Sequence, residues 1–204
     1  MLGSLLSFIA WKKGYKRFLI LSILLFLTSS MELYVQYLVA KDVDFTYLYH
    51  SFIAIEYPLF CWFLLGAVSS GKFSTAIKIS IPIYMIVSLS ISVFYYHFTG
   101  FPGLNINFEG MLQSIVCTYI LFNLEVQEDR SILKNHYFWI CSGILIFFGT
   151  TFFFNGVYTK LLNMDSNKAF QIFGMINKPL NLILYALILI GTLCLLTSRK
   201  PITQ

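Results

Sequence analysis

Long apolar segments, separated by short polar ones, make up most of this chain. Six of the segments have 19 to 26 residues, and about 20 apolar residues suffice for a helix to cross a bilayer. The pattern therefore predicts an all-α, polytopic transmembrane helix bundle that forms a single domain over residues 1–204. The six full spans are expected at Phe18–Ala40, Phe45–Ser70, Ile77–Phe98, Phe108–Val126, Phe138–Tyr158 and Lys178–Leu196.

The first ten residues, Met1–Ala10, are apolar but too short to span, because ten helical residues rise only about 15 Å. They predict an interfacial or partly inserted helix, or what remains of a longer first span. Towards the other terminus, Met164–Ile176 is expected to form a short separate helix with Asp165 or Ser166 as its N-cap. Pro102 and Gly103 predict a turn in the loop Thr99–Asn107.

Composition agrees with this architecture. Residues of the hydrophobic types make up 58% of the chain and charged residues 11%, whereas a soluble domain carries about 25% charged residues. The net charge of +5 therefore indicates no nucleic-acid partner. The four cysteines lie inside apolar segments without ligand-like spacing and are interpreted as packing residues: Cys61, Cys117, Cys141 and Cys194.

Basic residues predict the orientation. Ten of the 14 lysines and arginines fall on one side of the predicted spans and four on the other, and such an excess marks the cytoplasmic side. We therefore expect a protein of the inner (cytoplasmic) membrane with a cytoplasmic C-terminus. The ten are Lys12, Lys13, Lys16, Arg17, Lys72, Lys78, Arg130, Lys134, Arg199 and Lys200.

Polar residues recur at spacings of three or four within each span, so each span is expected to turn one polar face inward. Hydroxyl groups on such faces are ordinary contacts between membrane helices. Acidic side chains are different, because one in the bilayer core costs about 2.5–3.5 kcal/mol and normally faces protein or water. Glu56 lies beside Pro58, where a kink is expected.

The strongly polar residues also gather in the half of the spans that is predicted to face outward. This placement favours an outward-facing polar pocket over simple packing contacts. We expect its ligand-binding residues to be Glu32, Gln36, Tyr49, Glu56, Glu109, Asn155 and Asn181. His50 and His97 are expected near the aqueous boundary, and His136 in a cytoplasmic loop.

Three functions fit this pattern. We expect a non-enzymatic, sensor-like or accessory subunit of a membrane complex, with membrane lipid and a protein partner or a second copy around it, and with no cofactor and no metal. A small transporter or channel that uses Glu32 and Glu56 is one alternative. A metal-dependent lipid hydrolase is the other, although only two histidines lie on the outer side and no paired-histidine motif is present.

Two stretches also resemble a known group of proteins. NHYFWICSGILIFFGTTFFF, which starts at Asn135, and LYHSFIAIEYPLF, which contains Glu56, are similar to segments of uncharacterised multi-pass membrane proteins of Bacteroidota-type bacteria. The resemblance covers about Tyr47 to Leu196. It implies a protein of about seven helices, in which Met1–Ala10 is the stub of the first, and it implies no particular activity.

Overall fold

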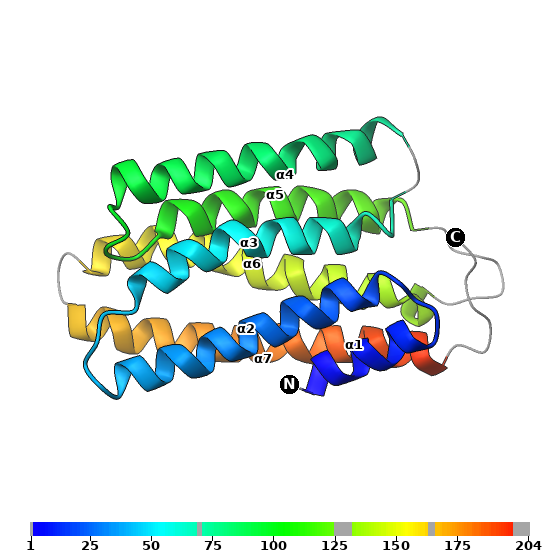
Figure 1. Cartoon of the computed structure of the whole chain (residues 1–204), viewed down its shortest axis with the longest axis horizontal. Coiled ribbons are helices and arrows are strands. Elements are labelled where there is room, and N and C mark those ends of the chain that lie inside the picture. The colour runs from blue at the N-terminus through cyan, green and yellow to red at the C-terminus, as the bar shows by residue number, and fades with distance from the viewer. Residues whose placement is uncertain (1, 69–70, 125–131, 163–165, 198–204) are drawn as a thin grey trace.

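The computed structural model describes residues 2–68, 71–124, 132–162 and 166–197, and it is entirely helical within them. The α-helices run side by side along the long axis of the molecule (Figure 1). They are α1 (Leu2–Lys12), α2 (Phe18–Val39), α3 (Thr46–Leu64), α4 (Lys72–Ser90), α5 (Gly103–Phe122), α6 (His136–Leu162) and α7 (Ser166–Thr197). A five-residue π-helix, η1 (Ile91–Tyr95), continues α4, and a short 3₁₀-helix, η2 (Ile132–Lys134), precedes α6.

The predicted helical bundle is confirmed. Among the described residues, four helical stretches are long and apolar enough to cross a membrane: Phe18–Val39, Lys72–Tyr95, His136–Tyr158 and Gln171–Thr197. Helices α3 and α5 have 19 and 20 residues and lie within the same bundle, but they carry more polar side chains. That they also cross the membrane stays a prediction.

Several predicted boundaries were wrong. Helix α5 begins at Gly103, directly after Pro102, so the predicted turn ends five residues earlier than expected. The predicted short helix at Met164–Ile176 is not separate, because α7 runs without a break from Ser166 through Pro179 to Thr197. Proline removes one backbone donor, and membrane helices tolerate this loss where neighbouring groups pack around it. Asp165 lies outside the described residues.

Helix α1 belongs to the bundle although it is short. Its 11 residues rise about 16 Å, roughly half of a bilayer core. It packs against α2 and α7. Ser4 and Ser22 join it to α2 by reciprocal bonds, in which each hydroxyl donates to the other residue's carbonyl oxygen at 3.0 and 2.9 Å.

We call the end where α2 leads into α3 the α2–α3 end of the bundle. The chain also enters α5 and passes from α6 to α7 there (Figure 1).

Just before α3, the Asp44 carboxylate accepts bonds from the backbone N–H and the hydroxyl of Thr46, at 2.9 and 2.8 Å. These bonds hold the pKa of Asp44 below its usual range and fix the start of α3.

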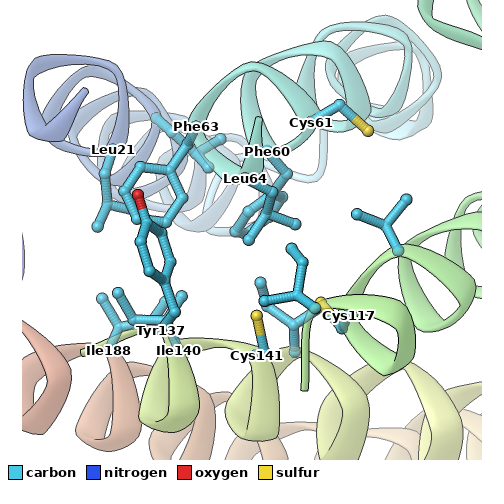
Figure 2. Close-up of a cluster of buried hydrophobic side chains, with 14 of the residues drawn as sticks. Leu21, Phe60, Cys61, Phe63, Leu64, Cys117, Tyr137, Ile140, Cys141 and Ile188 are labelled. Carbon is cyan, nitrogen blue, oxygen red and sulfur yellow. The ribbon is translucent and has the colours of Figure 1, made fainter. Parts of the chain in front are cut away.

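Towards the opposite end the interior is mostly apolar. Figure 2 shows Tyr137 of α6 pointing at Phe63 of α3, with Leu21 of α2 beside them. Arg17 donates to the Trp62 carbonyl at 2.7 Å and so satisfies one of the last carbonyls of α3. The cysteines are all free, and three of the four are buried, as their interpretation as packing residues requires.

Gly191 marks the closest approach of α7 to α6. A Cβ atom there would lie 2.8 Å from the His136 carbonyl oxygen and 2.9 Å from an Ile140 side-chain carbon. The helices cannot keep this separation with any larger residue at position 191, because the nearest atom belongs to the backbone.

We therefore expect Gly191→Ala to destabilise the protein by about 1–3 kcal/mol, as overpacking of a tight interior does. Gly149→Ala is the matched control, because a Cβ atom there meets nothing within 4 Å. Denaturant titration of both variants in detergent measures the difference. Equal stability of the two variants would contradict the close packing of α6 on α7.

Candidate functional site

Buried polar side chains gather towards the α2–α3 end of the bundle. Those buried there are His50, Ser88, Ser92, Asn105, Glu109, Gln113, Thr151 and Asn155. The other buried polar residues in the described part of the chain lie nearer the opposite end and are four serines, one threonine and one histidine. The predicted polar asymmetry between the two halves is therefore present in the folded chain.

Helix α5 supplies the centre of this region. Asn105, Glu109 and Gln113 follow one another at intervals of four residues, so they share one face of the helix. Their side chains are 0, 1 and 0% exposed. We call these three residues the polar column. It spans about 12 Å along the helix axis.

The column is tied to α3 and η1 through hydrogen bonds at one end. The Asn105 amide donates to the Ser92 hydroxyl at 2.8 Å and to the Ser88 carbonyl oxygen at 3.2 Å. The Ser92 hydroxyl in turn lies 3.0 Å from Nδ1 of His50. The rings of Tyr96 and Phe98 pack against the imidazole, with centroid distances of 5.2 and 5.9 Å.

Several atoms of this region have no hydrogen-bond partner although they are buried. Polar groups withdrawn from water are normally bonded, so each exception calls for an explanation. Within the polar column the unpartnered atoms are Asn105 Oδ1, Glu109 Oε1, Gln113 Nε2 and Gln113 Oε1. Nε2 of His50 and Oγ of Ser88 are also unpartnered.

Two further glutamates approach the column from neighbouring helices. Glu56 of α3 interacts electrostatically with Glu109 of α5, and Glu32 of α2 interacts with Glu56. Their burial increases in that order, since Glu32 is exposed, Glu56 half-buried and Glu109 buried. We call these three residues the carboxylate row.

Tyrosines line the row on two sides. Tyr49 of α3 lies close enough to Glu32 to interact with it electrostatically. Tyr185 of α7 interacts with both Glu56 and Glu32. The structure therefore brings four of the seven predicted ligand-binding residues into one neighbourhood: Glu32, Tyr49, Glu56 and Glu109.

The other three predicted residues are placed differently. Gln36 is exposed on α2. Asn155 of α6 is buried and donates to the Asn107 side chain of α5 at 3.1 Å. Asn181 donates to the Asn177 carbonyl of its own helix at 3.0 Å.

Some expectations about orientation were wrong. The polar face of the first full span does not turn inward along its whole length, because Glu32 and Gln36 are exposed. His50 is fully buried, because the turn after η1 folds over it, whereas the sequence suggested a place near water. His136 starts α6 and is buried against Phe18, although it was expected in a loop.

Asn105 was missed because the helix was expected to start only at Phe108. Its spacing of four residues before Glu109 is the signal that could have revealed it. Ser92 was recognised as part of a polar face, but its bonds to His50 and Asn105 depend on the π-helical turn, which has no clear sequence signature.

The described residues contain no group of three or more His, Cys, Asp or Glu side chains placed to hold a metal ion. His97 is exposed in the turn after η1 and does not join His50. The ligand set considered for a hydrolase is therefore not assembled within these residues.

Comparison with known proteins gives no match: no family model, no curated protein and no solved structure is similar to this chain. The resemblance to multi-pass proteins of Bacteroidota-type bacteria therefore stays an expectation.

The hydrogen bonds around Ser92 predict a specific loss of stability. Ser92→Ala should destabilise the protein by about 1–3 kcal/mol, because it leaves the buried imidazole and the Asn105 amide short of a partner. Ser90→Ala is the control, since that hydroxyl bonds only the Ile86 carbonyl of its own helix. Denaturant titration in detergent compares the two, and an equal effect would mean that the network contributes nothing.

Proposed function

We propose that this protein is a non-enzymatic membrane protein, a sensor-like or accessory subunit, that binds a small polar ligand at the polar column. The ligand enters from the α2–α3 end, which the distribution of basic residues predicts to face outward. Binding is passed to a partner chain or a second copy of this chain through the helices that surround α5.

The unpartnered atoms of the polar column carry this proposal. Contacts that merely hold membrane helices together are made between polar groups that satisfy each other. Gln113 does the opposite, since both of its side-chain polar atoms are buried without a partner. Leaving such groups bare costs about 1–3 kcal/mol each, so a partner from outside the chain is the better explanation.

The position of α5 supports the idea of a transmitted change. Helix α5 packs against α6, α3 and α4 and touches η1. A ligand bonded to Glu109 or Gln113 would therefore act on three neighbouring helices at once. The metal-dependent hydrolase gains no comparable support, since no three of its predicted ligand side chains converge closely enough to hold a metal ion among the described residues.

A transporter is the second candidate, and the carboxylate row favours it. The row leads from exposed Glu32 to buried Glu109, as a path for a proton or cation would. Proton or cation flux into liposomes that disappears in Glu32→Gln would establish this function. Ligand binding without flux would leave the sensor or subunit proposal in place.

Gln113→Met tests the ligand-binding proposal. Methionine keeps the length of the side chain and removes both unpartnered atoms. We expect native mass spectrometry of gently extracted wild-type protein to show a bound small molecule, and the variant to lose it. After the ligand is stripped by detergent, the variant should unfold at a temperature equal to or above that of the wild type.

Gln171→Met is the control, because this glutamine is exposed on α7. It should keep the bound small molecule. The proposal fails if the wild type carries no small molecule, or if Gln113→Met carries as much of it as the wild type.

A further inference from the structure

The carboxylate row has no positive partner within the described part of the chain. Glu32, Glu56 and Glu109 come from three helices and influence one another electrostatically. The charged groups that act on Glu56 and Glu109 are other glutamates, and no described lysine, arginine or histidine is among them. A carboxylate withdrawn from water is destabilised unless a cation or hydrogen-bond donors lie beside it.

The polar column next to this row offers mainly acceptors. The unpartnered atoms Asn105 Oδ1, Glu109 Oε1 and Gln113 Oε1 are all oxygens, and Gln113 Nε2 is the one donor among the unpartnered atoms of the column. Asn105 and Gln113 each lie about one helical turn from Glu109, on either side of it. An ammonium group has three donors and no acceptor, so its hydrogen-bonding demand complements this set.

Aromatic rings stand beside the same carboxyl group. The Tyr84 hydroxyl donates to the Ile53 carbonyl at 3.4 Å, and this tyrosine interacts electrostatically with Glu109. The Tyr84 ring packs on Tyr57 and Phe108, with centroid distances of 4.3 and 5.6 Å. Aromatic faces attract cations, and they also accommodate the alkyl part of an organic one.

We propose that the polar column and the carboxylate row bind the ammonium group of a primary amine, with Glu109 as the main anionic partner and Asn105 or Gln113 as a further acceptor. This proposal rests on the ligand-binding function proposed above and names the chemical class of the ligand. An anion would be repelled by the row. A divalent metal ion is disfavoured because no three ligand side chains converge among the described residues.

Two sources could supply the same group. A free amine would enter from the aqueous side, whereas the ethanolamine headgroup of a phospholipid would enter from the bilayer beside Glu32, which is exposed on α2. Glu32 and Glu109 each lie about 10 Å from the nearer end of their helix. The ammonium group of either amine therefore has to reach below the membrane surface.

The test uses the full-length protein in nanodiscs of phosphatidylcholine, which has no primary amine. Binding of n-butylammonium chloride is followed by isothermal titration calorimetry and by the thermal unfolding midpoint. Sodium chloride at equal ionic strength and n-butanol serve as the salt and neutral-isostere controls. We expect butylammonium, and neither control, to bind and to raise the midpoint.

Glu109→Gln should weaken butylammonium binding about tenfold or more, because a buried charged partner is lost. Glu56→Gln is the second variant if the first does not fold, and it should weaken binding in the same direction. Asp42→Asn removes a charge from an exposed loop and should bind as the wild type does.

Nanodiscs of phosphatidylethanolamine distinguish the two sources. If the headgroup is the ligand, these discs raise the midpoint of the wild type but not of Glu109→Gln, and added butylammonium raises it no further. If a free amine is the ligand, butylammonium acts equally in both lipids. Either pattern supports the proposal.

Equal binding of n-butanol, or full butylammonium binding by the glutamate variants, would overturn the ammonium proposal. So would the absence of any effect of amine in either lipid. A bound small molecule that depends on Gln113 would still be seen by mass spectrometry in that case. The ligand-binding function would then survive, and only the chemical class of the ligand would be wrong.

Discussion

Polar groups that leave water need partners inside the protein, and this constraint divides the bundle into two halves. Towards one end, Phe63, Tyr137 and their neighbours fill most of the interior, and the other buried polar side chains described there are hydroxyls and the His136 imidazole, so packing largely determines the arrangement (Figure 2). Towards the α2–α3 end, the interior side chains include a carboxyl group, three amides and an imidazole. Here the arrangement depends on which of these groups can form hydrogen bonds with one another. In the polar column, several of these groups find no hydrogen-bond partner within the described part of the protein.

Much of the fold followed from the pattern of apolar segments. The long segments became helices, and the spacing of Glu109, Gln113 and Cys117 correctly placed one face of α5 in the interior. The predicted positions of several helix ends were wrong. Pro102 is the N-cap of α5 and Pro179 lies within α7, although both residues suggest an interruption in a sequence. Packing against neighbouring helices decided these cases, and it is not visible from local sequence.

The candidate site was predictable in part for the same reason. Glu32, Glu56 and Glu109 stood out in the sequence because they are acidic residues within predicted membrane spans. The structure places them in one row. Which of them is buried could not be derived, because burial depends on where the neighbouring helices pass. The fully buried His50 illustrates this point, since its cover comes from Tyr96 and Phe98, more than 40 residues further along the chain.

The π-helical turn η1 has a consequence for chain length. Its hydrogen bonds join residues five apart, as in the bond from the Tyr96 N–H to the Ile91 carbonyl, so this turn holds more residues than an α-helical one. A homologue that is one residue shorter here could keep an unbroken membrane-spanning helix. The residues after the deletion would keep about the same orientation around the helix axis, because the turn would lose only its extra residue. Ser92 lies inside the turn, so its bonds to His50 and Asn105 would be disturbed while the hydrophobicity of the span stayed the same. Hydropathy profiles could therefore not separate such homologues from chains that retain the network.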